Sequence, residues 1–276
     1  MLNSATLAAD VGKLAKSLPP FPAIVIRLLD MLRDDSVSFD VLSHMASQDP
    51  VISANILAHA NHVRRMHAQA DLSDARVAAS IIGINRVRRI VVATGMNRFV
   101  SAVPGGPFLF HHSLAVAITA QELAALNGDS QDLAYIAGML HDVGQLCLHL
   151  IDETAFEKVY MDSVGDGKLV QREAAVFGAD HCAVGAHLAR HWNLPEEIYS
   201  AILNHHDDET VTCPLQAAIC LSETVVRALD IPQSPKNRVT ILNSHAVAEL
   251  EIDWGSADMA DLYDRCVTRY RHATQH

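Results

Sequence analysis

Residues 134–148 read AYIAGMLHDVGQLCL, and this stretch decides the fold class. Its apolar residues recur at the three- and four-residue spacing of a helix, on both sides of one polar pair, His141 and Asp142. Gly144 follows the pair and permits the chain to turn there. We therefore expect one helix near 131–141 and a second near 143–150, with the polar pair at their junction.

The same spacing continues outward over almost the whole chain, for example at Leu114, Ile118 and Leu123. No convincing alternating strand is present, so the sequence predicts an all-α protein. Before the decisive stretch, helices are expected near 22–33, 38–45, 49–60, 73–83, 84–100 and 108–126. After it, they are expected near 152–163, 168–176, 181–192, 195–204, 213–229 and 256–273.

The strongest break in this pattern is Pro104-Gly105-Gly106-Pro107, because two fixed φ angles flank two freely rotating residues. We place a subdomain boundary there. The sequence then divides into an N-terminal helical lobe at 1–103, a second helical lobe at 104–230 and a C-terminal helical extension at 231–276.

Composition limits the class of protein. The 276 residues are 50% apolar, which suffices for a sizeable core. The net charge of −11 repels phosphate backbones and argues against nonspecific binding to nucleic acid. The N-terminus lacks the apolar core of a signal peptide, and no later stretch has the length of an uncharged membrane span. We expect a cytoplasmic protein without a membrane partner.

The five cysteines stand apart without a CxxC pair, and an odd number cannot be fully paired within the chain. Reduced thiols are therefore expected, which agrees with a cytoplasmic location. None of the five has the histidine and acid arrangement of a catalytic nucleophile. They are expected to be small buried or half-buried residues.

Histidines gather at the expected helix ends in the second half of the chain. His112 opens a helix, His141-Asp142 ends one, His181 opens another, and His205-His206 closes a fourth. Neutral imidazole and carboxylate oxygen together suit divalent iron, manganese, zinc or nickel, and an aspartate can bridge two ions. Spacing alone leaves two interpretations open, because isolated histidines on apolar helices are often structural.

Several motifs occur in an order that resembles a known family. HSLAVAITAQELA (112–124), AYIAGMLHDVGQLCL (134–148), FGADHCAVGAHLARHWNLP (177–195) and AILNHHDDE (201–209) are similar to the HD phosphohydrolase superfamily in its HDOD variant. The first half is also similar to that family, at SLPPFPAIVIRLLDML (17–32), SQDPVISANILAHAN (47–61) and SIIGINRVRRIVV (80–92). The resemblance implies an HD-domain-like helical bundle with an N-terminal helical lobe, in a bacterial signal-transduction protein.

The resemblance also implies a ligand set for a divalent transition metal, with one or two ions. His112, His141, Asp142 and Glu223 would surround one ion, and His181, His205 and His206, with Asp142 bridging, would surround a second. Glu223 departs from the family, which usually has aspartate there, so it must reach with one extra methylene.

Two further departures concern catalysis. Gln145 stands where the active HD-GYP relatives carry a lysine, and the GYP signature is absent from HHDDETVTCP (205–214). The sequence also has no arginine or lysine cluster beside the motifs, whereas a phosphoester transition state needs positive charge beyond the metal.

Two functions follow from these observations. The first is a noncatalytic regulatory or protein-interaction module that retains the metal site and has a signalling protein as its partner. The second is a metal-dependent phosphohydrolase acting on a nucleotide or cyclic dinucleotide. Retention of the ligands favours the enzyme, and Gln145 with the absent GYP signature favours the module, which we expect.

Overall fold

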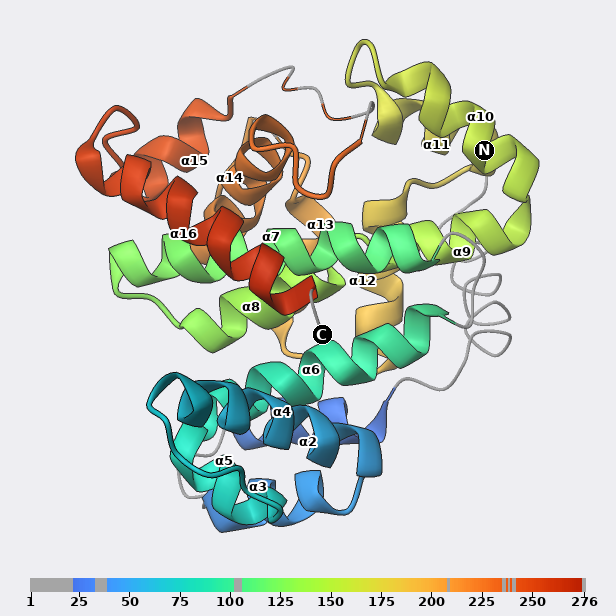
Figure 1. The fold of residues 1–276 in the computed structure, drawn as a ribbon. Helices are drawn as coiled ribbons and strands as arrows, with labels where there is room; N and C mark the ends of the chain where they lie inside the picture. Colours follow the sequence, from blue (N-terminus) through green and yellow to red (C-terminus); the bar gives the residue numbers. More distant parts are fainter. Residues whose placement is uncertain are drawn as a thin grey trace. The chain divides into compact units, whose positions relative to one another are not determined.

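The computed structural model describes residues 22–32, 39–101, 106–207, 209–234, 237, 239 and 242–274 (Figure 1). These residues form helices and connecting turns, with no β-strand among them, so the predicted all-α fold is confirmed. The described chain separates into two compact units, Pro20–Phe99 and Val100–His276. Each unit is described by itself.

The helices of the Pro20–Phe99 unit are α2 (Ala23–Leu32), α3 (Phe39–Ser47), α4 (Pro50–Met66), α5 (Ala75–Ile82) and α6 (Ile84–Ser101). Asp49 caps α4, since its carboxylate accepts hydrogen bonds from the backbone amides of Val51 and Ile52 at 2.9 and 3.1 Å. The same carboxylate accepts two hydrogen bonds from the guanidinium of Arg98 in α6. One aspartate thus starts α4 and ties it to α6.

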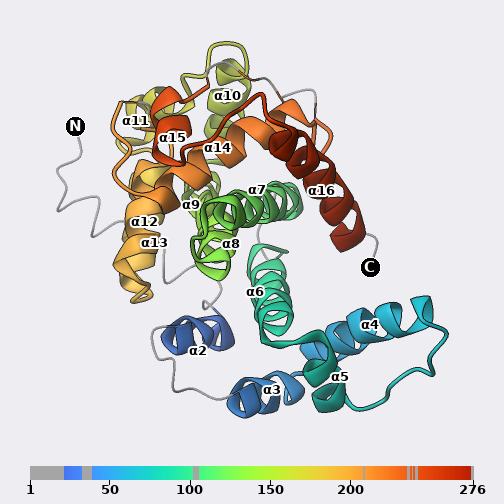
Figure 2. The ribbon, with the colours of Figure 1, turned by 90° about the vertical axis from the view of Figure 1, so that its left-hand side faces the viewer.

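The Val100–His276 unit contains the remaining helices, which Figures 1 and 2 show from two sides. They are α7 (Gly106–Asn127), α8 (Gln131–Leu140), α9 (Val143–Ile151), α10 (Glu153–Ser163), α11 (Leu169–Phe177), α12 (His181–His191), α13 (Glu196–Asn204), α14 (Pro214–Ala228), α15 (Ser244–Glu249) and α16 (Ala257–Thr274).

Helix α7 is the central helix of this unit, and α8, α14 and α16 pack against it (Figure 2). From Ser113 to Ala124 its side chains are buried on every side, including Val116, Ala117 and Leu123 at 0% exposure. This stretch is mostly apolar, and its few polar side chains, among them Glu122, are buried as well. The N-terminal part of α7 carries His112 into this interior.

Two glycines allow close contacts between helices, one between α7 and α8 and one between α9 and α12. A Cβ on Gly138 of α8 would lie 2.5 Å from the Cα of Ala117 in α7. A Cβ on Gly144 of α9 would lie 2.0 Å from the carbonyl oxygen of His181 and 2.7 Å from the amide nitrogen of Gly185, both in α12. Gly144 is therefore needed for the close contact between α9 and α12. Its position after Asp142 had indicated a turn, but the contact between the helices is what requires a glycine here.

The predicted helix ranges agree with the structure to within a few residues, with two exceptions. Helix α4 continues to Met66, beyond the expected end near residue 60, and the six-residue helix α15 was not expected. Residues 102–105, where the Pro-Gly break begins, lie outside the described residues. The proposed limits of the lobe and extension at 103 and 230 stay predictions. Among the described residues, no helix is long and apolar enough to cross a membrane.

Candidate metal centre

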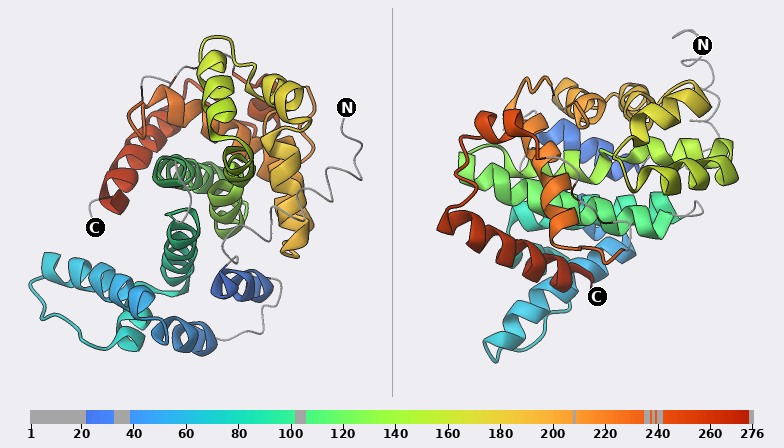
Figure 3. Two further views of the ribbon diagram at one scale, coloured as in Figure 1. Left: turned by 90° about the vertical axis from the view of Figure 1, so that its right-hand side faces the viewer. Right: turned by 90° about the horizontal axis from the view of Figure 1, so that it is seen from above.

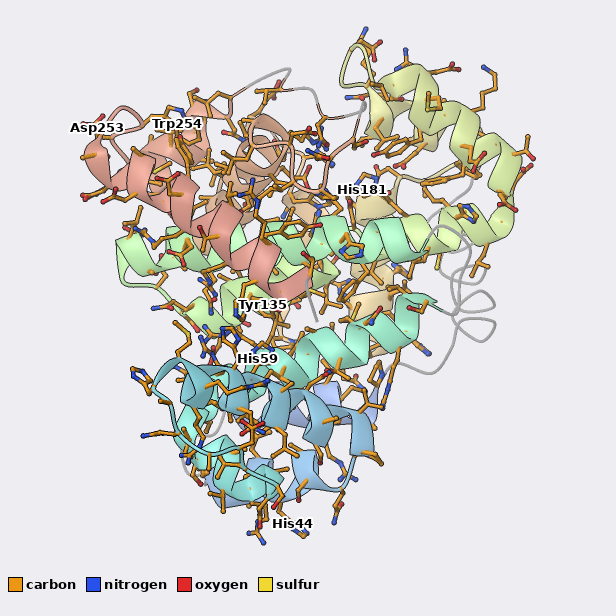
Figure 4. All side chains as sticks on the ribbon, in the orientation of Figure 1. His44, His59, Tyr135, His181, Asp253 and Trp254 are labelled. Atoms are coloured by element: carbon orange, nitrogen blue, oxygen red, sulfur yellow. The ribbon has the colours of Figure 1, made fainter. Side chains whose placement is uncertain are left out.

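The structure brings together the seven side chains that the sequence singled out. They come from α7, from the junction of α8 and α9, from the start of α12, from the end of α13 and from α14. Figure 4 shows His181, one of the seven, among the helices of the unit rather than on its outline. Their donor atoms form two groups: His112, His141, Asp142 and Glu223, and Asp142, His181, His205 and His206.

The first half of the cluster is centred on Glu223. Its Oε1 atom lies 2.7 Å from Nε2 of His112 and 2.9 Å from Nε2 of His141. The extra methylene of glutamate therefore carries the carboxylate to both histidines. Oδ2 of Asp142 lies 3.5 Å from Nε2 of His112 and 3.3 Å from Nε2 of His141.

The second half is formed by histidines around the other oxygen of Asp142. Oδ1 lies 3.2 Å from Nε2 of His181 and 3.6 Å from Nε2 of His205. The ring of His206 is half-buried and lies against those of His205 and His181, with centroid distances of 4.4 and 5.1 Å. Asp142 thus presents one oxygen to each half of the cluster, as a bridging carboxylate would.

Hydrogen bonds orient three of the histidine rings. Each bond is made at Nδ1, the outer nitrogen, so that Nε2, the inner nitrogen, points into the cluster. His141 donates from Nδ1 to the carbonyl oxygen of Gly138 at 2.7 Å, and His205 donates from Nδ1 to that of Ile202 at 2.7 Å. A carbonyl oxygen can only accept, so Nδ1 carries a proton in both rings. In a neutral ring, Nε2 then holds the lone pair and is available as a ligand.

Glu173 of α11 orients the third ring, and the sequence interpretation missed it. Its Oε2 lies 2.5 Å from Nδ1 of His181 and accepts the backbone N–H of the same residue at 3.0 Å. Both side chains are fully buried. A carboxylate behind a ligating histidine raises the basicity of the ring and fixes its orientation. The available signal was a glutamate on the apolar helix that precedes His181 by eight residues.

Cys182 is buried, as expected, and it also lies beside the second half. Its Sγ is 3.6 Å from Nε2 of His181 and 4.0 Å from Nε2 of His205, and the residue is 4% exposed. Burial raises the pKa of this thiol, but His181 and His205 outweigh that effect and lower its pKa to about 7. No motif in the sequence had indicated this contact.

A cation beside the cluster also escaped the sequence interpretation. Arg227 stands one helical turn after Glu223 in α14 and donates to its Oε2 at 2.6 Å. The guanidinium side chain is 33% exposed, so it reaches from the buried carboxylate toward solvent. Its i,i+4 spacing in the sequence SETVVRA was the available signal.

The charges of the cluster control one another. Burial would raise the pKa of Asp142, yet the neighbouring histidines, His141 first, hold it well below its usual range. Burial likewise opposes protonation of His141, but Asp142 and Glu223 outweigh it and raise its pKa to about 10. The pKa of His206 is lowered well below its usual value by burial and by the charges of His205 and His181. Carboxylates are thus held ionised inside the protein by adjacent positive charge.

The donor set fits a divalent metal ion. Nε2 atoms of His181 and His205 face each other at 3.3 Å, and their lone pairs repel unless a proton or a cation lies between them. Oδ1 of Asp142 is buried and accepts no hydrogen bond. A buried carboxylate oxygen without a donor is costly, and a cation would satisfy it. The identity of the metal stays a prediction.

The chain is similar to several known proteins. Ribonuclease Y from Campylobacter jejuni subsp. doylei is 24% identical over 207 residues, which are 75% of this chain and 34% of that protein. An uncharacterised protein of Treponema pallidum (strain Nichols) is 23% identical over 239 residues, 81% of this chain and 45% of the relative. The chain therefore spans less than half the length of these curated relatives.

Solved structures show the same fold. An HDOD domain protein of unknown function from Geobacter sulfurreducens is 26% identical with a TM-score of 0.78, and 98% of each chain is covered. A "Putative phosphohydrolase" from Shewanella amazonensis SB2B is 22% identical with a TM-score of 0.69, covers 94% of each chain and supports the fold alone. Residues 18–208 match the HDOD domain family over more than half of the chain. This chain therefore belongs to the HDOD domain family.

Proposed function

We propose that the protein is an HDOD signal-transduction module in which a bound divalent metal fixes the helix ends around the cluster. The surface of the helices would then be held in one arrangement and offered to a partner protein. The observation that carries the proposal is the placement of Asp142, whose two oxygens face the two halves of the cluster. Such a carboxylate supports a site for one or two ions.

Burial of the donors supports a structural task for the metal. The side chains of His141, His181 and His205 are fully buried, and that of His112 is 12% exposed. Ligands on five separate parts of the chain need a cation to balance their charge and to hold them at short distances. A site with so little exposed surface suits an ion better than a large substrate.

The alternative is a metal-dependent phosphohydrolase acting on a nucleotide or cyclic dinucleotide, and Arg227 is the observation that favours it. Its half-buried guanidinium stands beside Glu223, where it would face a phosphate that entered over the cluster. A divalent ion bound there would lower the pKa of a bound water and polarise a phosphoryl oxygen. The name of the ribonuclease Y relative is in keeping with this chemistry.

Gln145 decides our preference for the module. A neutral amide stands where the resemblance to active relatives would place a lysine, and this residue is half-buried in the first turn of α9. Arg227 is already paired with Glu223, so its charge is shared with a carboxylate. Two cations would be expected around a transferring phosphoryl group in an efficient enzyme.

The test is metal analysis of the purified protein followed by assays against a panel of phosphoesters. We expect a bound divalent transition metal and negligible turnover of cyclic dinucleotides. The double variant His141→Ala with Asp142→Ala should lose the metal while far-ultraviolet circular dichroism still shows a helical protein. A pull-down with equal amounts of metal-loaded and metal-free protein then compares how much partner protein each of them binds.

An enzyme would give a different result. Robust hydrolysis of any phosphoester by the wild type, lost in the double variant and reduced by Arg227→Met, would replace the module with the phosphohydrolase. Protein that binds no divalent ion under any condition, while remaining folded, would contradict both proposals.

A further inference from the structure

Cys182 has surroundings that no other cysteine of the described chain shares. Its Sγ faces the inner nitrogens of His181 and His205, the same atoms that face Oδ1 of Asp142. Cys220 is also buried, but its Sγ donates to the backbone carbonyl of His205 at 3.1 Å. Cys220 therefore contacts the outside of this histidine, and Cys182 contacts the side that points into the cluster.

Five separations among Sγ, the two Nε2 atoms and Oδ1 lie near the edges of a tetrahedral site. Zinc binds nitrogen and oxygen at about 2.0–2.1 Å and sulfur at about 2.3 Å, so tetrahedral coordination separates two nitrogens by about 3.3 Å and nitrogen from sulfur by about 3.6 Å. The two Nε2 atoms are 3.3 Å apart, and Sγ is 3.6 and 4.0 Å from them. Oδ1 of Asp142 is 3.2 and 3.6 Å from the same nitrogens.

A second observation at the same place indicates a missing partner. Oδ1 of Asp142 accepts no hydrogen bond although the residue is only 5% exposed. It is aimed at the nitrogens that Cys182 also faces. A cation held among Oδ1, the two Nε2 atoms and Sγ would satisfy this oxygen.

We propose that Cys182 supplies a thiolate ligand to the ion held by Asp142, His181 and His205. This inference rests on the proposed metal-binding function and adds a ligand to it. As the bond between sulfur and metal forms, the thiol proton leaves to solvent, and no electrons are transferred. The resulting set of two nitrogens, one oxygen and one sulfur is typical of zinc, because thiolate and imidazole in tetrahedral geometry select it over manganese or magnesium.

His206 would then be a further donor at the more exposed edge of this half. It is half-buried, whereas the other donors of this half are buried. A fifth donor at an exposed edge can bind or leave as the ion exchanges, while Cys182 stays in the interior. Variants of Cys182 and His206 are therefore expected to have different effects on metal binding.

X-ray absorption of the zinc-loaded wild-type protein tests the proposal without any variant. We expect a sulfur neighbour at about 2.3 Å from zinc beside nitrogen and oxygen neighbours. Cobalt-loaded protein should show a sulfur-to-cobalt charge-transfer band in the near ultraviolet. Cys182→Ser should abolish both signals and weaken zinc binding at least tenfold, because serine keeps the volume and hydrogen bonding but is a poor ligand.

Three controls separate the possible outcomes. Cys220→Ser, which alters a buried thiol next to the same histidine, should keep the sulfur signal, and so should His206→Ala. A zinc protein with only nitrogen and oxygen neighbours would overturn the role of Cys182 and leave the metal-binding module intact. Failure of the folded wild type to bind zinc or cobalt, in protein that binds iron or manganese, would overturn the role of Cys182 alone, and failure to bind any divalent ion would overturn both. Circular dichroism of Cys182→Ser shows whether this variant folds. If it does not fold, the X-ray absorption spectrum of the zinc-loaded wild type alone decides whether sulfur binds the metal.

Discussion

At the residue scale, Glu173 has the most consequential position outside the seven predicted ligands. It is completely buried, and its Oε2 contacts both the ring and the backbone amide of His181. Its other oxygen, Oε1, has no hydrogen-bond partner. A buried carboxylate in that position is tolerated because it sets the direction and basicity of one ring.

Glu173→Gln should therefore weaken metal binding by about 10- to 100-fold while the protein remains folded. The amide keeps the shape of the side chain but loses the negative charge behind His181. Isothermal titration of metal-free protein with zinc measures the change. Glu197→Gln, an exposed glutamate at the start of helix α13, is the matched control and should bind zinc like the wild type. Equal affinities for the two variants would show that Glu173 has only a packing role.

The sequence predicted the histidines and Asp142 because they stand in motifs at helix ends, where spacing and resemblance agree. It did not predict the contacts of Glu173, Cys182 or Arg227. Glu173 acts through the ring of His181, and Arg227 pairs with Glu223. Cys182 faces the inner nitrogens of His181 and His205. The spacing of these residues does not single them out, because glutamate, cysteine and arginine at such positions are equally compatible with ordinary packing and surface charge.

At the scale of elements, the crossing of α9 and α12 positions the centre of the cluster. Gly144 lies two residues after Asp142, and the carbonyl oxygen of His181 occupies the space where its Cβ would be. The distance between these two ligands thus depends on the absence of one methyl group. Sequence reasoning found the glycine but gave it the wrong task, since a close approach between helices depends on tertiary packing.

Gly144→Ala should separate α9 from α12 and cost about 1–3 kcal/mol of unfolding free energy, as expected for overpacking. Metal affinity should fall as well, because Asp142 and His181 move apart. Gly165→Ala is the matched control, since a Cβ there meets nothing within 4 Å and the backbone does not require positive φ. Urea denaturation of both variants measures the stabilities, and a Gly144→Ala protein as stable as the control would refute the close-packing argument.

A second element contact gives a pH dependence. Glu122 of α7 accepts hydrogen bonds from Arg265, at 2.7 Å, and from Arg269, both in α16. Burial raises the pKa of Glu122, but the two arginines outweigh burial and hold the pKa below its ordinary value. The contribution to stability is therefore complete above the pKa of an unfolded glutamate and is lost as pH falls through the lower, folded pKa.

Comparison of the wild type with Glu122→Gln should show this dependence. We expect the wild type to be more stable by about 1 kcal/mol near neutral pH, at the low end for a charged hydrogen bond because both arginines are partly exposed. The difference should shrink on acidification below about pH 4.5. Thermal melts over a pH series measure it, and a difference that grew toward acid would contradict the assigned sign.

Helix α15 shows why one element was missed. It has only six residues, too few for a recurring apolar pattern, and Asn243 caps it by accepting the backbone N–H of Ala246 at 2.9 Å. Short helices are held by caps and by packing on a neighbour, here α14, rather than by their own periodicity. The long helices, in contrast, could be predicted because their apolar faces repeat over several turns.

At the scale of the whole molecule, the metal should stabilise the folded chain by mass action. All candidate ligands lie in the Val100–His276 unit, which Figure 3 shows from two further sides. An ion present at 100 times its dissociation constant adds about 2.7 kcal/mol. Removal of metal with a chelator should therefore lower the melting temperature, and readdition should restore it.

The same experiment on the His141→Ala and Asp142→Ala double variant provides the control. Its melting temperature should be lower than that of the loaded wild type and should not respond to the chelator. A wild-type melting temperature that is unchanged by chelation, in protein shown to have lost its metal, would mean that the ion does not fix the helix ends.

The spread of the ligands along the chain also has a consequence for how the protein is made. His112 and Glu223 meet at 2.7 Å although 111 positions separate them. During synthesis, a growing chain that has not reached α14 can present the histidines of the first half but cannot complete their site. Tight retention of an ion in the first half must then come late, after α7 and α14 have met, and a molecule loaded in that half is one whose synthesis has passed Glu223.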